Sequence, residues 1–91
     1  MTKELITINL DSGLEATLAA MLVQVASKYD STVYVQSEDG AIKVNAKSIM
    51  GMMSLGVSNG MKLVISADGK DEKEAVSDIR QYLGGKEDRE S

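Results

Sequence analysis

Hydrophobic and polar residues alternate with a period of two in four segments of the chain. These segments are residues 6–10, 32–36, 42–45 and 61–67. In the first of them Ile6, Ile8 and Leu10 are separated by polar residues, which is typical of a strand with one buried face. A polar turn at 37–40 joins the second and third segments. The sequence therefore predicts four strands, two of them in a hairpin.

Elsewhere the hydrophobic residues recur every three or four positions, which predicts three helices. The first hydrophobic stripe comprises Leu18, Met21, Leu22, Val25, Ala26 and Tyr29. A short second helix is predicted over residues 49–55, with Ser48 as its N-cap. Asp71 and Glu74 have the spacing of a capping box and predict the start of a third helix. Its stripe comprises Ala75, Val76, Ile79, Tyr82 and Leu83, and Gly84-Gly85 ends it.

The order of the predicted elements, β-α-β-β-α-β-α, indicates an α+β protein built from two layers. Each strand has one apolar face. We therefore expect an open-faced sandwich, with a single four-stranded antiparallel sheet and three helices on one face of it. A chain of 91 residues has room for one hydrophobic core. The expected organisation is a single domain over residues 1–84 and a flexible polar tail over 85–91.

The composition excludes several kinds of chemistry, because the chain contains no His and no Cys. Without these residues it cannot build a Ser-His-Asp triad, a thiolate nucleophile, a zinc finger or a phosphorylated imidazole. The two carboxylates in the turn at 37–40 lack the spacing of a calcium-binding loop, and no Gly-rich phosphate loop is present. Any chemistry must therefore run through hydroxyls, carboxylates, amines or the backbone, and we expect a protein that is not an enzyme and that holds neither a metal nor a cofactor.

The charge balance and the hydropathy limit the partners. Ten basic and 14 acidic residues give a net charge of −4, and only three Tyr provide aromatic surface. Direct binding of nucleic acid is therefore not expected. No apolar run approaches the ~18 residues of a membrane span, and the N-terminal residues lack the hydrophobic core of a signal peptide. These features predict a cytoplasmic protein without membrane insertion.

Two stretches of the sequence carry motifs of a known family. Residues 11–29 include the run Gly-Leu-Glu-Ala-Thr-Leu-Ala, and residues 44–55 include the run Asn-Ala-Lys-Ser-Ile-Met-Gly. In both stretches the chain resembles HPr, the phosphocarrier of the bacterial sugar phosphotransferase system, and the second run is typical of Gram-positive members. The likeness covers residues 6–83. It implies the HPr fold and membership of the phosphotransferase system family.

The resemblance also implies that the phosphorelay is lost. In the family, a His before the first helix takes phosphate from enzyme I and passes it to a sugar permease subunit, while an Arg helps to hold the phosphate. This chain has Glu15 at the His position, Thr17 at the Arg position and Leu18 at the position of a Pro. The positions that match the motif are Gly13, Leu14, Ala16 and Ala19. The catabolite-repression branch of the family also lacks the His, although it keeps the Arg and Pro, and its members are the nearest analogues.

A second family site aligns with Ser48. In the family, HPr kinase phosphorylates this Ser, and the phosphorylated proteins are corepressors of a catabolite-control transcription regulator. The residue alone predicts an N-cap, and both roles are compatible, since phosphate adds about −1.5 to −2 charge at a helix N-terminus. The resemblance implies a regulatory phosphorylation site at Ser48, with the kinase and the regulator as partners. The family Arg also contacts both partners, and Thr17 does not supply that contact.

The partner-binding face implied by the resemblance combines the loop before the first helix with the second helix. Its residues are Glu15, Thr17, Lys47, Ile49, Met50 and Met53. The second helix is too short to bury all of its hydrophobic side chains, and we expect Met50 and Met53 to be the exposed pair. Glu15 has two interpretations. It either stabilises the helix start by about 0.3–1 kcal/mol or presents a constant charge in place of phosphorylated His.

The sequence leaves three functional hypotheses open. The first is a regulatory HPr-like protein that binds protein partners, with phosphorylation of Ser48 as its switch. The second is an unregulated binding or structural module in which Glu15 is a fixed charge. The third is a phosphocarrier for sugar uptake that uses another residue. Gly13 follows the first predicted strand, so exchange of that strand between two copies of the chain is also open.

Overall fold

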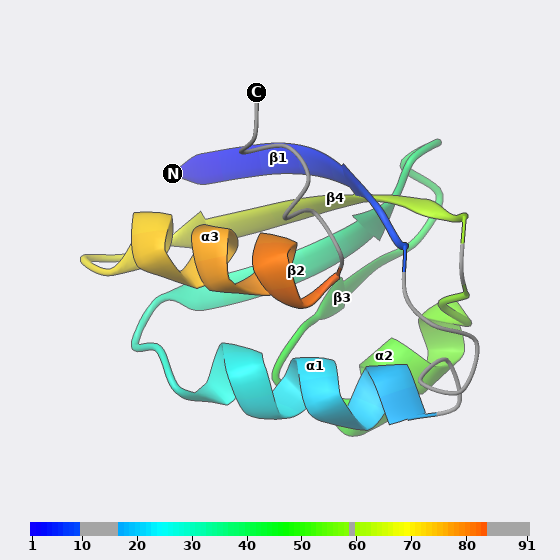
Figure 1. Ribbon diagram of the computed structural model, residues 1–91, viewed down its shortest axis with the longest axis horizontal. Helices are drawn as coiled ribbons and strands as arrows, with labels where there is room; N and C mark the ends of the chain where they lie inside the picture. Colours follow the sequence, from blue (N-terminus) through cyan, green and yellow to red (C-terminus); the bar gives the residue numbers. More distant parts are fainter. Residues whose placement is uncertain (10–16, 59, 84–91) are drawn as a thin grey trace.

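The computed structural model describes residues 1–9, 17–58 and 60–83, and these contain four strands and three helices (Figure 1). In chain order they are β1 (Thr2–Thr7), α1 (Leu18–Ser27), β2 (Thr32–Ser37), β3 (Lys43–Asn45), α2 (Ile49–Leu55), β4 (Lys62–Asp68) and α3 (Glu72–Tyr82). The predicted order and the α+β class are confirmed. No helix in the described stretches combines the length and hydrophobicity needed to cross a membrane.

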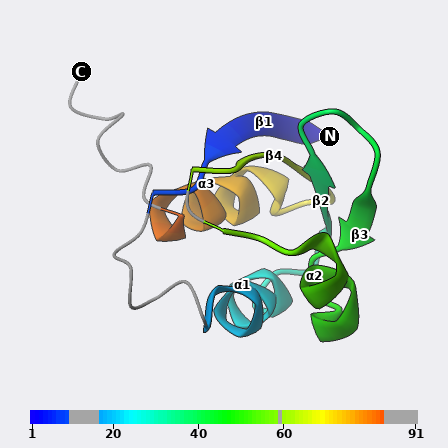
Figure 2. The same ribbon diagram turned by 90° about the vertical axis from the view of Figure 1, so that its right-hand side faces the viewer.

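The strands form one antiparallel sheet in the order β1-β4-β2-β3. The edge strands are β1 and β3, and the central strands are β4 and β2. Figures 1 and 2 show from two directions that the three helices cover the same face of the sheet. The predicted open-faced sandwich is therefore confirmed.

The hydrophobic core lies between the sheet and the helices. Alternate strand residues point into it, and the paired Val35 of β2 and Ile65 of β4 are both fully buried. The buried helix residues are Leu18, Leu22 and Ala26 of α1, Met52 and Leu55 of α2, and Ala75, Val76 and Ile79 of α3. Full burial of a large aliphatic side chain contributes about 1.5–3 kcal/mol. This burial fixes the helices against the sheet.

The first strand differs from its prediction. β1 ends at Thr7, and its polar first half, beginning at Thr2, is paired with β4. Ile8 is buried but lies beyond the paired segment, where its backbone N–H donates to the Met61 carbonyl at 2.9 Å. The predicted start at residue 6 was wrong because backbone hydrogen bonds hold this edge strand, and they do not require apolar side chains. Leu10, at the predicted end, lies outside the described residues.

The buried stripe of α1 is narrower than predicted. Leu18 and Leu22 are fully buried, whereas Met21 is exposed over 37% of its surface. Successive residues of an α-helix are rotated by about 100°, so Met21 lies beside the buried stripe and not within it. Its Sδ accepts a hydrogen bond from the Tyr82 hydroxyl of α3 at 2.7 Å. Met21 therefore connects two helices at the surface, and its prediction as a core-facing residue was wrong.

The predicted capping box at the start of α3 does not form. Asp71 occupies the N-cap position, but its side chain makes no cap hydrogen bond. Its carboxylate instead accepts from the backbone N–H groups of Asp30 and Ser31, at 2.8 and 2.9 Å, and from the buried Ser31 hydroxyl. These bonds, which we call the Asp71 contact, join the start of α3 to the segment before β2. The local spacing of Asp71 and Glu74 does not encode this long-range partner.

The hairpin between β2 and β3 is confirmed, with Val35 opposite Val44. Its turn is closed by Asp39, whose Oδ1 accepts from the Ala41 N–H at 3.0 Å and from the Ser37 hydroxyl at 2.7 Å. These two bonds, the Ala41 bond first, lower the pKa of Asp39 below its usual value. The carboxylate is thus used within the turn. The part of the chain that the structure describes contains no group of three or more side chains suited to hold a metal ion.

Candidate protein-binding face

The residues that the sequence marks for partner binding fall on two neighbouring helices. α1 and α2 are in contact and lie side by side in both ribbon views (Figures 1 and 2). Thr17 directly precedes α1 and is exposed, whereas Glu15 lies outside the described residues. The residues at and within α2 are Lys47, Ser48, Ile49, Met50 and Met53. The fold therefore places the described candidates on two adjacent helices, with Lys47 beside the end of α1 and Thr17 at its start.

Ser48 begins α2 as the predicted N-cap. Its backbone is extended, with φ −107° and ψ 116°, and its Oγ accepts a hydrogen bond from the Gly51 N–H at 3.2 Å. The Ser48 carbonyl accepts from the Met52 N–H at 3.0 Å. A Cβ at position 51 would lie 3.2 Å from that of Val44, so glycine allows the helix to pack closely on β3. Ser48 itself is exposed, and its capping hydroxyl therefore lies at the surface.

Asn45, which is not among the predicted site residues, shapes the segment before Ser48. Its Oδ1 accepts from the Lys47 N–H at 2.8 Å, and its carbonyl accepts from the Ser48 N–H at 3.0 Å. A side-chain bond to the N–H two residues later is the Asx turn that Asn favours, and this was the available sequence signal. The Lys47 ammonium donates to the Tyr29 carbonyl at 2.7 Å. Lys47 is therefore engaged just beyond the end of α1.

The outer side of α2 is apolar. Ile49, Met50 and Met53 are exposed over 42%, 77% and 68% of their surfaces, and we call these three residues the α2 patch. Met52 and Leu55 of the same helix are buried in the core. The helix contains no charged residue. The predicted exposure of Met50 and Met53 is confirmed, and clustered exposed hydrophobic residues are typical of protein contact surfaces.

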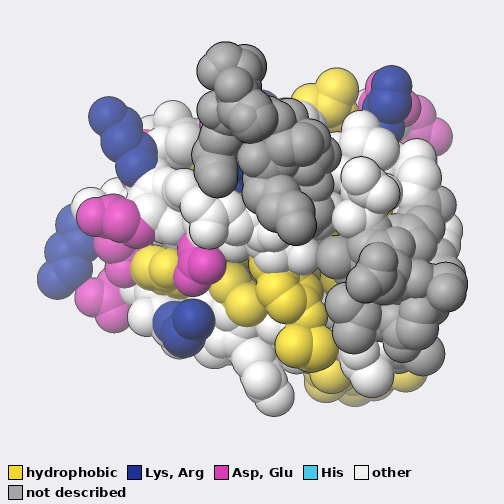
Figure 3. All heavy atoms as spheres, viewed as in Figure 1, with side chains coloured by type: hydrophobic (Ala, Val, Ile, Leu, Met, Phe, Trp, Pro, Cys, Tyr) yellow, Lys and Arg dark blue, Asp and Glu magenta, His cyan; other side chains and the backbone are white. Residues whose placement is uncertain are grey.

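Further hydrophobic side chains are visible on the helix side of the molecule. Figure 3 shows them as a band between α3 and α1 that continues toward the lower right, where Figure 1 shows α1 and α2. The partly accessible hydrophobic residues of α1 and α3 include Met21, Val25 and Tyr82. The α2 patch therefore lies in a part of the molecule where apolar surface is common.

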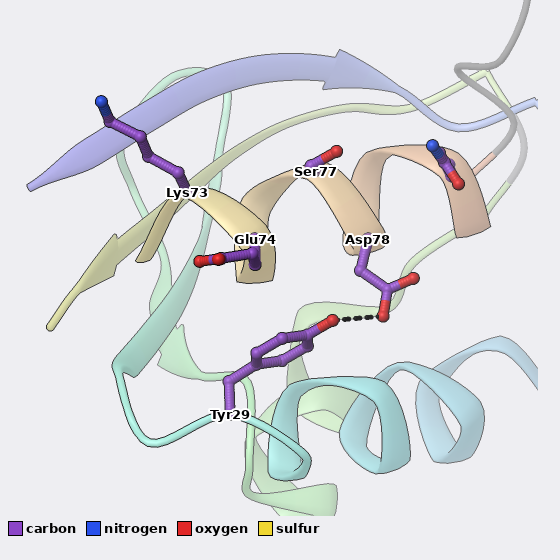
Figure 4. Close-up of a pocket in the computed structure, with 6 residues that line it drawn as sticks. Tyr29, Lys73, Glu74, Ser77 and Asp78 are labelled. Carbon is purple, nitrogen blue, oxygen red and sulfur yellow. Dashed lines mark hydrogen bonds between the residues drawn. The ribbon is translucent and has the colours of Figure 1, made fainter. Parts of the chain in front are cut away.

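A shallow pocket of about 470 Å³ lies between α3 and the segment after α1 (Figure 4). Its lining residues are Tyr29, Lys73, Glu74, Ser77, Asp78 and Gln81. The Tyr29 hydroxyl donates to Asp78 at 2.6 Å, and this bond, followed by burial, raises the pKa of Tyr29 to about 12. Lys28 lies 3.6 Å from the same carboxylate. None of the predicted site residues lines this pocket, and its polar groups connect α3 to the end of α1.

Comparison with known proteins identifies the family. Residues 2–84 match the family model described as PTS HPr component phosphorylation site. The chain is 43% identical to the HPr-like protein Crh of Bacillus subtilis over 83 residues, which are 91% of this chain and 95% of Crh. The chain therefore belongs to the HPr family of the phosphotransferase system, as its two motifs predicted.

Solved structures of the family have the same fold. HPr-C-His from Thermoanaerobacter tengcongensis superposes with a TM-score of 0.82 at 45% identity, and the match covers 94% of each chain. Crh, the Bacillus subtilis catabolite repression containing protein, superposes with a TM-score of 0.68 at 40% identity. That match covers 93% of this chain and 95% of Crh, which is an intertwined dimer with a swapped domain in that crystal structure. The chain is thus similar both to a phosphocarrier and to a catabolite-repression protein.

Proposed function

We propose that this protein is a regulatory member of the HPr family that binds protein partners through the α2 patch and the start of α1. Phosphorylation of Ser48 is the switch. The observation that carries the proposal is the composition of the α2 region, where the exposed cap Ser48 begins a helix that also exposes Ile49, Met50 and Met53. A phosphorylated hydroxyl beside an apolar patch offers a partner both charge and hydrophobic contact.

Phosphorylation is compatible with the cap that Ser48 makes. Phosphoryl oxygens at this position can accept the Gly51 N–H that the hydroxyl now accepts at 3.2 Å. α2 has no charged residue, and the Lys47 ammonium donates to the Tyr29 carbonyl. The added charge of about −1.5 to −2 therefore calls for Arg or Lys from a partner. On the family resemblance, we expect HPr kinase as the modifying enzyme and a catabolite-control transcription regulator as the partner.

The proposal also holds that the protein does not carry phospho-His. Glu15 stands at the position of the family His, and Thr17 stands at the position of the Arg. A carboxylate has less charge and fewer acceptor oxygens than a phosphoryl group, so Glu15 imitates phosphorylated His only in part. Regulation through Ser48 is the function that remains.

Incubation with two phosphate donors tests this proposal. With ATP and the HPr kinase of the host bacterium, we expect a mass gain of about 80 Da on Ser48. The control Ser48→Asn should gain nothing, because Asn caps a helix equally well but has no hydroxyl. Phosphoenolpyruvate with enzyme I should label neither protein. Label from phosphoenolpyruvate would favour the phosphocarrier hypothesis, and an unmodified Ser48 would remove the switch.

An unregulated binding module is the second candidate, and Thr17 favours it because the family Arg that contacts kinase and regulator is missing. In this module Glu15 acts as a permanent charge. Glu15→Gln keeps the shape of the side chain and removes its charge, so it should weaken binding of the module's protein partner if the module is correct. Equal affinities of the parent and Glu15→Gln would end the fixed-charge interpretation.

The similarity to dimeric Crh also supports an assembly proposal for this chain. Among the strands of the described residues, β1 is an edge strand that pairs with β4 alone, so its exchange between two copies leaves the β4-β2-β3 part intact. The same β1–β4 pairing then forms between copies. We expect a dimer fraction that rises with protein concentration in analytical ultracentrifugation. A protein that stays monomeric at millimolar concentration would contradict this proposal.

A further inference from the structure

The six methionines of the chain differ widely in exposure. Met50 and Met53 are among the most exposed side chains, whereas Met52 on the same helix is fully buried. Met21 is less exposed, and its Sδ accepts a hydrogen bond from Tyr82 at 2.7 Å. Apart from the first residue of the chain, the two most accessible thioethers among the described residues therefore lie on α2.

Met50 and Met53 are also close together. They are three positions apart in a helix, and this spacing places two side chains next to each other on one face. Together they make up two of the three residues of the α2 patch. Because α2 carries no charged side chain, these two residues largely determine the polarity of its outer side. A chemical change at their sulfur atoms therefore alters the patch as a whole.

We propose that Met50 and Met53 form a reversible oxidation site, at which a hydroperoxide switches off the partner binding described under Proposed function. The thioether sulfur attacks one oxygen of the hydroperoxide, the O–O bond breaks and an S–O bond forms. The sulfur is oxidised to a sulfoxide, the proton of the attacked oxygen passes to the leaving oxygen, and the peroxide is thereby reduced to water or an alcohol. A methionine sulfoxide reductase restores the thioether with two electrons from a pair of thiols, which become a disulfide while the sulfoxide oxygen leaves as water. This inference rests on the proposed function, since it needs a partner at the α2 patch.

Oxidation changes the energetics of the contact because a sulfoxide is polar and a thioether is not. A partner that covers the α2 patch must then remove water from two sulfoxide oxygens, and this is unfavourable without new hydrogen bonds. We expect the affinity to fall by about tenfold or more. The fold should survive, because Met50 and Met53 lie outside the core and the buried Met52 keeps its thioether.

Peroxide treatment of the folded protein, followed by peptide mapping, tests the site itself. Met50 and Met53 should each gain about 16 Da well before Met52 does, with no change in the circular dichroism spectrum. Met52 is a matched internal control, since it lies in the same helix and differs in burial. Oxidation of Met52 at the same rate would overturn the proposal, because burial would then give no selectivity.

Binding of the Ser48-phosphorylated protein to the catabolite-control regulator, before and after peroxide, tests the consequence. We expect oxidation to weaken binding by the parent by about tenfold. The control variant Met21→Leu, which is changed outside the α2 patch, should lose the same factor of affinity on oxidation. The double variant Met50→Leu and Met53→Leu has no oxidisable sulfur in the patch. Its affinity, whatever its starting value, should be the same before and after treatment. If peroxide lowers the affinity of this double variant as much as it lowers that of the parent, the proposal is overturned.

The two proposals fail in distinguishable ways. If the untreated, phosphorylated protein does not bind the regulator, the proposed function fails, and the role of oxidation in binding fails with it. If the untreated protein binds and its oxidised form binds equally well, only the oxidation proposal fails. Treatment of the oxidised protein with methionine sulfoxide reductase should restore the affinity. Persistent loss after both sulfoxides are removed would contradict a reversible site.

Discussion

The Ser48 hydroxyl caps α2 by accepting a hydrogen bond from the Gly51 N–H, and the same hydroxyl is the proposed site of phosphorylation. Three residues near Ser48 have separate structural roles. Asn45 orients the chain before it, Lys47 contacts the segment after α1, and Met50 contributes to the exposed patch. The residue pattern predicted the cap and the exposed methionines, because both depend on local helix geometry. It did not predict the partner of Lys47, since Tyr29 is distant in sequence.

The structural function of Ser48 can be measured separately from phosphorylation. Ser48→Ala should lower the free energy of unfolding by about 0.5–2 kcal/mol, because the Gly51 N–H loses its acceptor. Ser48→Asn should stay close to the parent, since Asn caps helices as well as Ser does. Urea denaturation of the three proteins provides the comparison. Equal stabilities of the Ala and Asn variants would show that the cap contributes nothing.

Tyr29 predicts a loss of stability at alkaline pH. Its hydrogen bond to Asp78, with burial second, raises its pKa from 10.0 to about 12. A raised pKa in the folded state means that the stabilisation is complete below pH 10 and disappears as the pH rises toward 12. Tyr29→Phe should therefore lose stability less steeply across this interval. Ultraviolet titration of tyrosinate should lack the step near 12 in the variant, and an unchanged titration would contradict the assignment.

The elements show clearly what the sequence could and could not predict. Three helices, the hairpin and β4 follow from hydrophobic periods, and the structure reproduces them within about one or two residues at most of their ends. β1 extends over polar residues because its partner β4 holds it through the backbone. The capping box failed because the Asp71 carboxylate bonds to Asp30 and Ser31. Long-range hydrogen bonds caused both the longer β1 and the missing capping box. The local spacing of residues contains no information about such bonds.

Acid should weaken the contacts that the start of α3 makes with β1, with the turn after β4 and with the segment before β2. The Ser31 hydroxyl, followed by the Asp30 N–H, lowers the pKa of Asp71, and the Gly69 N–H, followed by the Thr2 hydroxyl, lowers that of Glu72 from 4.5 to about 2. A lowered pKa in the folded state means that the stabilisation is complete above the unfolded-state pKa. It is then lost as the pH falls through the folded-state value.

The variant with Asp71→Asn and Glu72→Gln tests this prediction. The free energy of unfolding of the parent, measured by thermal denaturation, should decrease as the pH falls from 4.5 to about 2. Glu72 sets this interval. The double variant should be less stable at neutral pH and should change less over that interval, because its amides do not titrate. Parallel pH profiles of the two proteins would contradict the assignment.

In the whole molecule, the residues that stabilise the fold and those proposed to contact a partner lie on different sides of α2. The core between sheet and helices needs only the inner side of α2, which leaves the α2 patch free to contact a partner. Sequence motifs predicted both the HPr family and the replacement of its His by Glu15, and the comparisons confirmed the family. The contact between α1 and the helix that carries the patch required the assembled fold, because the two helices are distant in sequence.

The central claim is that phosphorylation of Ser48 switches on the binding of a protein partner at the α2 patch. Its most direct test is the dissociation constant of the catabolite-control regulator of the host bacterium, measured with unmodified and with Ser48-phosphorylated protein. New charge-assisted hydrogen bonds from the regulator to the phosphate should tighten binding by about tenfold or more. Equal dissociation constants for the two forms would contradict the account.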